Sequence, residues 1–304
     1  MEYDVIILGG GAAGLTAAIY TSRAMHKTLV IEEKAVGGQM MYTTDIENYP
    51  GFPDGVMGFE LSALMEKQAK KFGAEIIYDS FQTIDLNNKK VTTINTEYRF
   101  KVLILTLGAE PARLNLPNEK ELTGRGVSYC ATCDGAFFRG QQVAVIGGGN
   151  TALHEALFLT NFANKIYLVH RRDRFRGERY LQEKLIKNPK IDLILNSVPI
   201  EIMGEEEVKG LKVKKLKDGE ELLLDVAGIF IFVGYNPRTE KVKGLVELNE
   251  RGYIKVDRFL TTSVPFIFAA GDCIDKPYKQ IASAVGDGCV SAMSAINYLE
   301  SLSY

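Results

Sequence analysis

Two glycine-rich segments restrict the fold of this chain more than any other feature of the sequence. The first, Gly9-Gly10-Gly11-Ala12-Ala13-Gly14, follows an apolar run and precedes a stretch of helical composition. The second, Gly147-Gly148-Gly149-Asn150-Thr151-Ala152, has the same setting. A G-x-G-x-x-G or G-x-G-x-x-A pattern between a strand and a helix is typical of a dinucleotide-binding unit. The sequence therefore predicts two such units in one chain.

The first segment has the residue types that a pyrophosphate site needs. Gly9 permits a tight turn, Gly11 lets the backbone approach the phosphates, and Gly14 lets the helix pack on the strand. The free N–H groups at the start of the helix can then bind the phosphates. Glu32 ends the next predicted strand, Thr28 to Ile31, where a carboxylate suits the hydroxyls of an adenosine ribose. A glycine turn without a ligand is the alternative reading.

The second segment is followed by basic residues in place of an acid. His170 lies at the same offset from Gly147 as Glu32 does from Gly9, and Arg171, Arg172, Arg174 and Arg176 come close behind. Such residues remove the carboxylate that would repel a 2′-phosphate and supply guanidinium groups to bind it. We therefore expect NADP(H) rather than NAD(H) at the second site. The alternative is a solvated or unspecific anion-binding surface.

Cys130-Ala131-Thr132-Cys133-Asp134 lies between the two glycine segments. Two cysteines separated by two residues can form a small disulfide, and such thiolates often have lowered pKa values. Half of a zinc site is the alternative, but a structural zinc needs four ligands. Cys273 and Cys289 do not form a second pair by spacing, and no histidine lies beside a cysteine. We therefore expect a redox-active dithiol and no metal.

The composition is that of an ordinary soluble globular protein of 304 residues, 46% apolar and 24% charged, a length that usually forms two cores. The formal charge of −2 indicates neither a nucleic-acid partner nor a membrane surface. The N-terminal residues show no signal peptide, and the apolar runs are too short to span a bilayer. We expect a cytoplasmic protein.

The order of the predicted elements indicates that one unit is inserted into the other. Candidate linkers lie at residues 109–113 and 234–237. The expected fold is α/β, with two Rossmann-like domains of three layers, each combining a parallel sheet with an antiparallel meander. Residues 1–112 and 246–304 would form the discontinuous domain, and residues 113–245 the inserted domain. In the first, residues 75–100 alternate like a meander.

Gly271-Asp272 ends a predicted strand near the C-terminus. A carboxylate in that position can meet a ribityl or ribose hydroxyl, although a helix N-cap or a loop residue is the alternative. Gly37-Gly38-Gln39 lies in a loop that is too long and too polar to be a mere connector.

With these motifs together, the whole chain resembles the low-molecular-weight thioredoxin reductases. The resemblance implies a homodimeric flavoprotein with FAD on the discontinuous domain and NADPH on the inserted domain. Electrons would pass from NADPH to FAD, then to the disulfide, and finally to a thioredoxin or thioredoxin-like protein. Cys133 would face the flavin, Cys130 would attack the partner, and Asp134 would protonate a leaving thiolate. Arg125, Phe137 and Phe138 match the region that contacts thioredoxin.

The resemblance also implies the residues that bind each nucleotide. For FAD they are Gly9, Gly11, Ala12, Ala13, Gly14, Glu32, Glu33, Gly38, Gln39, Asn48, Gly271, Asp272, Lys279, Gln280, Ile281 and Ala282. For NADPH they are Gly147, Gly149, Asn150, Thr151, His170, Arg171, Arg172 and Arg176. Two positions depart from the family pattern: Ala12 stands where proline is common, and Lys279 where arginine is usual. The first should alter rigidity more than cofactor identity, and the second weakens any planar guanidinium contact.

Cys133 lies fourteen residues before Gly147, so the dithiol and the second nucleotide belong to the same domain. A single arrangement should not present both to one flavin, and we expect the inserted domain to rotate between half-reactions. Alternative hypotheses keep the same fold but use NADH or ferredoxin as the electron donor, or a peroxiredoxin-like or glutaredoxin-like protein as the electron acceptor. A further reading is a flavin-bound redox sensor without turnover.

Overall fold

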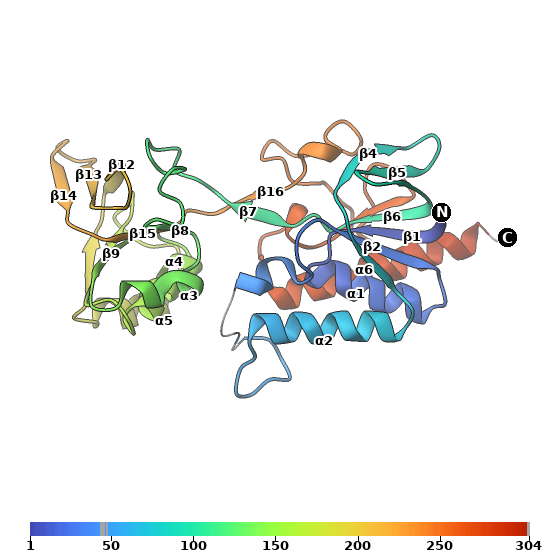
Figure 1. Cartoon of the computed structure of the whole chain (residues 1–304), viewed down its shortest axis with the longest axis horizontal. Helices are drawn as coiled ribbons and strands as arrows, with labels where there is room; N and C mark the ends of the chain where they lie inside the picture. Colours follow the sequence, from blue (N-terminus) through green and yellow to red (C-terminus); the bar gives the residue numbers. More distant parts are fainter. Residues whose placement is uncertain (43–45, 47, 303–304) are drawn as a thin grey trace. The chain divides into compact units, whose positions relative to one another are not determined.

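The chain forms two compact units, Met1–Glu110 with Asn236–Tyr304, and Pro111–Tyr235 (Figure 1). The computed structural model describes residues 1–42, 46 and 48–302. Within these ranges, Tyr42, Thr132 and Cys133 are described by their backbone alone. The discontinuous unit resumes at 236 and not at the expected 246. The physical reason is that Val242 is fully buried in the core of this unit, together with Val246 and Ile254.

The centre of the discontinuous unit is a parallel sheet in the order β3-β2-β1-β6, with β17 pairing β6. Its strands are β1 (Glu2–Leu8), β2 (Thr28–Glu32), β3 (Glu75–Tyr78), β6 (Glu97–Leu105) and β17 (Ile267–Ala269). Ile6 pairs with Leu29 on one side and Leu103 on the other. From Val5 to Leu8 the strand β1 is apolar and buried, as expected where both of its faces are covered.

The antiparallel addition is shorter than the sequence predicts. It consists of β4 (Phe81–Asp85), β5 (Lys90–Thr93) and the beginning of β6. The Asp85 side chain accepts hydrogen bonds from the backbone N–H groups of Asn87 and Asn88 and so fixes the predicted turn. The expectation that the meander begins at residue 75 is wrong, because β3 pairs with β2 in parallel.

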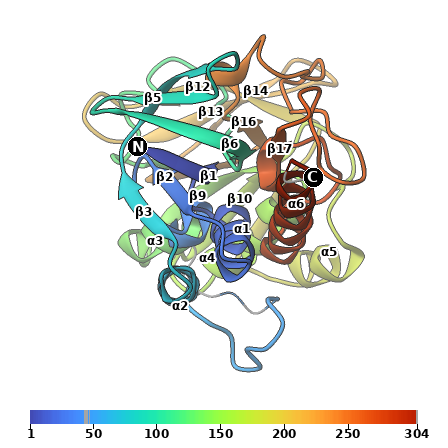
Figure 2. The same cartoon turned by 90° about the vertical axis from the view of Figure 1, so that its right-hand side faces the viewer.

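Three helices and the meander make this unit three-layered. The helices are α1 (Ala12–Arg23), α2 (Gly58–Lys71) and α6 (Ile281–Ser301), with short 3-10 turns η1 (Gly38–Tyr42), η3 (Glu240–Val242) and η4 (Gly271–Cys273). Figure 2 shows α1 and α6 on one side of the sheet and β5 on the other. Small residues let the helices lie close to β1: Ala17 and Ala292 share a core with Val5. The helices therefore hold their N-terminal turns at the ends of the strands.

The inserted unit repeats this plan with a parallel sheet in the order β11-β10-β9-β15-β8. The strands are β8 (Val127–Ser128), β9 (Gln142–Gly147), β10 (Lys165–Val169), β11 (Ile191–Ile194) and β15 (Gly228–Phe232). The helical elements α3 (Ala131–Asp134), η2 (Gly135–Phe138), α4 (Asn150–Leu159) and α5 (Arg179–Ile186) belong to this unit. Ala152 and Leu153 of α4 are fully buried in one core with Val143 and Val145 of β9. The predicted α/β fold with parallel and antiparallel sheets is confirmed.

The opposite face of that sheet carries the antiparallel strands β12 (Ser197–Met203), β13 (Gly210–Lys215) and β14 (Glu221–Leu224). Ile202 and Leu211 are buried there with Ile146 of β9. The strand β12 contains a proline, which is disfavoured in a central strand. Pro199 is accommodated because β12 is an outer strand whose register shifts between Pro199 and Glu201.

The two passages of the chain between the units pair with each other as a two-stranded sheet. They are β7 (Ala109–Pro111) and β16 (Tyr235–Pro237), at the two predicted linkers. Next to them, Arg238 forms ion pairs with Glu110 at 3.0 Å and with Glu33 at 2.7 Å, all within the discontinuous unit. Among the helices formed by the described residues, none combines the length and apolar character that a membrane crossing requires.

Candidate functional site

The first glycine turn connects β1 to α1 and leaves room for a ligand at its centre. Gly9 has φ of +106°, and a Cβ there would overlap the carbonyl oxygen of Thr106. A Cβ on Gly14 would overlap the carbonyl oxygen of Gly9. Gly11, in contrast, faces open space, with no atom within 4 Å of the place where its Cβ would be. The turn is therefore crowded on the protein side and open where a pyrophosphate would lie.

Glu32 lies directly beneath this turn. Its Oε2 accepts a hydrogen bond from the Gly10 backbone N–H at 2.6 Å, and its Oε1 accepts one from the Lys34 N–H at 2.9 Å. The residue is only 7% exposed. Each carboxylate oxygen has a second lone pair, so the fixed carboxylate can still accept from a ribose hydroxyl.

The Gly37–Gly38 loop is joined to the same turn. The Gly37 N–H donates to the carbonyl oxygen of Gly10 at 2.8 Å, and the position for a Cβ on Gly38 lies 3.4 Å from the Gly11 Cα. The neighbouring Gln39 donates from Nε2 to the carbonyl oxygen of Ala109 at 3.2 Å. The structure thus brings Gly38 of the predicted FAD set to the first glycine turn, whereas Gln39 bonds to the backbone just after β6.

Glu33 has a different environment from Glu32. Its two carboxylate oxygens are engaged by Arg238 at 2.7 Å and by the Ser80 hydroxyl at 3.1 Å. This predicted cofactor residue is therefore held by side chains of its own unit.

Asp272 follows β17, and its buried Oδ1 accepts no hydrogen bond from the described residues, although Lys276 Nζ lies 3.7 Å away. Burial raises the pKa of this carboxyl, while Lys276 and Lys279 oppose the rise. Lys279 donates from Nζ to the Asp272 carbonyl oxygen at 2.8 Å and lies over the ring of Tyr253. A buried acceptor without a donor fits a ligand hydroxyl at this end of the sheet.

Gln280 is the N-cap of α6 and exchanges hydrogen bonds with Ser283 in a capping box. Its Oε1 also accepts a hydrogen bond from Asn48 Nδ2 at 3.2 Å. Ile281 and Ala282 are the first residues of the helix. This part of the predicted FAD set is therefore gathered around one helix N-terminus.

The second glycine turn repeats the geometry of the first. Gly147 follows β9, and a Cβ there would overlap the carbonyl oxygen of Phe232, whereas Gly149 faces open space. Asn150 begins α4, and its side chain accepts a hydrogen bond from the Glu178 N–H at 2.6 Å. The same crowded and open sides are therefore present at both turns.

A cavity of about 540 Å³ lies at this turn, within the inserted unit. Its walls include Gly147, Gly149, Thr151, Arg171 and Arg176. That volume is within the range of small-molecule and cofactor sites. The lining also includes Arg113, and these guanidinium groups and a glycine turn in one cavity can bind phosphate groups.

His170 lines the same cavity but is packed beneath the turn. A Cβ on Gly148 would overlap the His170 ring, which also stacks on Phe175 with ring centroids 5.5 Å apart. Among the described residues its buried Nε2 has no hydrogen-bond partner, and burial and the nearby arginines lower the pKa of the imidazole. His170 is therefore a neutral part of the cavity wall at pH 7. Arg172 is exposed and is not part of the wall.

The dithiol segment begins immediately after β8. Cys130 is disulfide-bonded, whereas Cys273 and Cys289 are free. The Ser128 hydroxyl accepts a hydrogen bond from the Cys130 N–H at 3.0 Å and donates to the Cys130 carbonyl oxygen at 3.1 Å. The side chain of Cys133 lies outside the described part of the structure. The Asp134 N–H donates to the Cys130 carbonyl oxygen at 3.2 Å, which closes the first turn of α3.

Sequence patterns did not indicate Ser128 or the buried Glu119, which supports this segment. The Glu119 carboxylate accepts hydrogen bonds from the backbone N–H groups of Leu114 and Leu116 and from the Tyr129 hydroxyl, at 2.6 to 3.1 Å. Leu114, Leu116 and Tyr129 line the cavity, and Tyr129 precedes Cys130. Within the residues described, no three metal-ligating side chains gather as they would around a metal ion.

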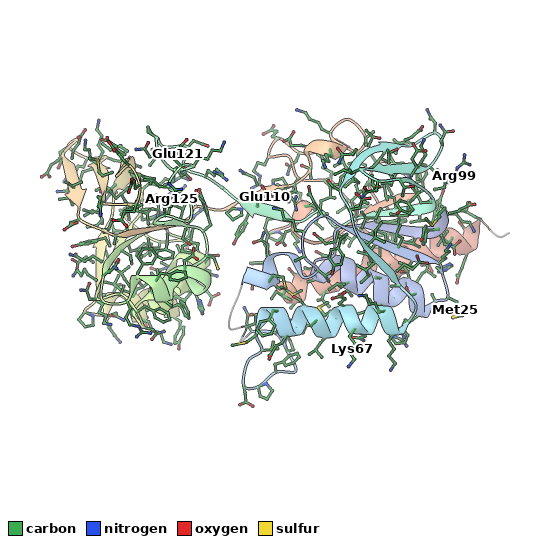
Figure 3. The ribbon with its side chains drawn as sticks, in the orientation of Figure 1. Met25, Lys67, Arg99, Glu110, Glu121 and Arg125 are labelled. Atoms are coloured by element: carbon green, nitrogen blue, oxygen red, sulfur yellow. The ribbon has the colours of Figure 1, made fainter. Side chains whose placement is uncertain are left out.

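The residues expected to contact a protein partner differ in exposure. Phe137 is 76% exposed, and Arg125 is exposed on the inserted unit (Figure 3). Phe138 instead packs edge-on against Phe230, with ring centroids 5.3 Å apart. Phe138 is therefore mainly a core residue, and Phe137 is the more exposed of the two.

Comparison with known proteins gives matches over nearly the whole chain. The family model described as pyridine nucleotide-disulphide oxidoreductase matches residues 3–288. A thioredoxin reductase of Streptomyces coelicolor is 48% identical, over 99% of this chain and 95% of that protein. One of Bacillus subtilis is 46% identical, over 99% and 96%. The crystal structure of Lactococcus lactis thioredoxin reductase in its FR conformation has 43% identity and a TM-score of 0.94, over 98% of this chain and 99% of that one.

Glu155 on α4 has a buried oxygen, Oε2, to which no described residue donates a hydrogen bond, and burial raises the pKa of its carboxyl to about 7. The unfolded chain therefore loses this proton near its ordinary pKa of 4.5, and the folded chain near 7. Glu155 should thus lower the free energy of unfolding by about 2 to 3 kcal/mol as the pH rises from about 5 to about 8.

In Glu155→Gln this contribution to the pH dependence of the free energy of unfolding should disappear. Denaturant unfolding at about pH 5 and about pH 8 measures the difference. Glu183→Gln is the matched control, since Glu183 lies on α5 with a side chain 58% exposed. If Glu155→Gln kept the pH dependence of the parent chain, the carboxyl would not be buried as described.

Proposed function

Because this chain belongs to the pyridine nucleotide-disulphide oxidoreductase family, and within it to the thioredoxin reductases, we propose that it reduces the disulfide of a thioredoxin or thioredoxin-like protein. The observation that carries the proposal is the disulfide-bonded Cys130 on the same unit as a glycine turn with its cavity. Its sulfur partner in the proposal is Cys133. No observation favours a different donor, a different acceptor or a sensor without turnover.

We propose that FAD binds the discontinuous unit at the first turn. Three features support this proposal: the open side of Gly11, the fixed carboxylate of Glu32 and the buried Oδ1 of Asp272, which accepts no hydrogen bond from the described residues. Glu32 ends β2 and Asp272 follows β17, on opposite sides of β1 in the sheet. A dinucleotide lying across the turn would therefore place its adenosine near Glu32 and its ribityl chain near Asp272.

We propose that NADPH binds the cavity of the inserted unit. Arg171 and Arg176 line the cavity near the end of β10, where a 2′-phosphate would lie. The Arg176 N–H also donates to the Gly148 carbonyl oxygen at 2.8 Å, which keeps this arginine beside the turn.

The bound flavin supplies the ability to accept a hydride from NADPH and to pass two electrons to a disulfide. We propose that the Cys130 thiolate attacks one sulfur of the partner disulfide and that the other partner sulfur leaves with a proton from Asp134. The Cys133 thiolate then attacks Cys130, which re-forms the Cys130–Cys133 bond and releases the second partner sulfur as a thiol. In balance, one NADPH and one proton convert one partner disulfide into two thiols.

We also propose a homodimer and a cytoplasmic location. Phe59 and Leu64 on α2, and Val290 and Met293 on α6, are between 40% and 52% exposed, which fits a surface covered by a second copy. Light scattering of the purified chain measures its mass in solution. The free Cys273 and Cys289 are consistent with a reducing compartment.

Serine in place of Cys130 or Cys133 should abolish the reduction of a thioredoxin disulfide, because neither variant can form the internal disulfide. In an anaerobic NADPH titration the parent chain should take up about four electrons and either variant about two, since only the flavin remains. Cys289→Ser is the control, because Cys289 is free and partly exposed. A colourless purified chain, or a serine variant with full activity, would show the proposal to be wrong.

Replacing both Arg171 and Arg176 by alanine should raise the KM for NADPH at least tenfold and change the KM for NADH little. The reason is that charged hydrogen bonds to a phosphate are worth about 1.5 to 3 kcal/mol each. Steady-state rates at constant ionic strength measure both constants. Arg179→Ala is the control, since the Arg179 side chain is 93% exposed and pairs with Glu183. An equal loss with both nucleotides would contradict a role in 2′-phosphate binding.

We propose that the inserted unit changes orientation between half-reactions, because the dithiol and the second turn share that unit and must each serve the flavin. A chemical cross-link joining the two units should reduce steady-state turnover at least tenfold while one half-reaction, followed anaerobically, survives. A cross-link within the inserted unit is the control. Full turnover in the chain with its units joined would exclude the rotation.

A further inference from the structure

Lys276 is a buried cation in the discontinuous unit, between η4 and α6. Its side chain is only 10% exposed. The ammonium group lies 2.6 Å from Asp287 Oδ2 and 3.7 Å from Asp272 Oδ1, and it donates to the Ser283 hydroxyl at 3.2 Å. One lysine therefore joins the turn after β17 to two side chains of α6.

Asp287 adds a second link between the same elements. Its Oδ2 accepts hydrogen bonds both from Lys276 and from the Gly271 backbone N–H, the latter at 3.2 Å. The Cβ position of Gly271 lies 2.9 Å from the Ala13 Cβ, and a Cβ on Gly288 would overlap the Ala13 carbonyl oxygen. The first turn of α1, the Gly271–Asp272 turn and the second turn of α6 thus meet at one place.

The charges around Asp272 show what Lys276 contributes there. Lys276 and Lys279 favour the charged form of this buried carboxyl, whereas Asp287 disfavours it. Lys276 is the cation that lies between the two carboxyl groups, since it contacts both. Without it, Asp272 and Asp287 would face each other without the cation that contacts both.

We propose that Lys276 is a positioning residue for the flavin: by pairing with Asp287 and Asp272 it holds the Gly271–Asp272 turn against α6, where the Asp272 carboxylate can accept a hydrogen bond from a ribityl hydroxyl. The inference rests on the proposed function, since it assumes FAD at this turn. The effect of Lys276 on nucleotide binding should be local, because Lys276 lies on the β17 side of β1 and Glu32 lies on the β2 side. Lys276 should therefore affect FAD binding and leave the binding of the adenosine diphosphate portion unchanged.

The test compares FAD with ADP on the full chain stripped of nucleotide, by calorimetric titration. In Lys276→Met the Kd for FAD should rise at least tenfold, while the Kd for ADP stays within about twofold of the parent value. Lys255→Met is the matched control in the same unit, since Lys255 forms a 2.6 Å ion pair with Glu247 but has a side chain 50% exposed. It should change neither constant.

Two results would overturn the role of Lys276: an unchanged Kd for FAD, or an equal loss for FAD and ADP, which would indicate general disruption. If Lys276→Met lacks a cooperative unfolding transition, Lys276→Gln, which keeps donors but loses the charge, undergoes the same two titrations with the same criteria. Failure of the parent chain to bind FAD would instead refute the proposed function. The two failures are therefore distinguishable.

Discussion

Close backbone packing at two glycine turns is the constraint on which the rest of this structure depends. At Gly9 the turn touches the Thr106 carbonyl oxygen, just beyond β6, and at Gly147 it touches the Phe232 carbonyl oxygen at the end of β15. In both units the neighbour is the parallel strand beside the first one. Neither contact leaves room for a side chain. The fit requires parallel strands in register, and the helix that follows then has its N-terminus at the sheet edge.

The sequence predicts this plan well because the residues that specify each unit lie close together in the chain. Apolar runs, glycine spacing and the acid after the second strand all lie within about thirty residues, the length of one strand–helix–strand unit. The parts that sequence patterns miss depend on contacts between distant residues. Glu119 is recognisable as a support only when Leu114, Leu116 and Tyr129 are seen around it. The orientation of β3 likewise depends on its pairing with β2.

Residues with matching motif positions can still have different surroundings in the folded chain. Phe137 and Phe138 are adjacent and chemically identical, yet the first is exposed and the second packs on Phe230. Arg171 and Arg172 are both exposed, yet only the first lines the cavity. Neighbouring side chains project in different directions from the backbone, and a motif does not state which direction faces a ligand. Exposure and cavity walls therefore discriminate among predicted site residues where spacing cannot.

The same comparison shows how one fold places different side chains beneath its two glycine turns. Glu32 lies beneath Gly10 and accepts its N–H, and His170 occupies the equivalent place beneath Gly148. Since burial lowers the pKa of His170, the space beneath the second turn holds a neutral ring where the first turn has a carboxylate. Arg113, Arg171 and Arg176 on the cavity wall then contribute positive charge, and the described group beneath the turn is the His170 ring and not a carboxylate. A single replacement beneath the glycine turn thus removes the negative charge, and the arginines on the cavity wall add the positive charge, while the packing of strand and helix is retained.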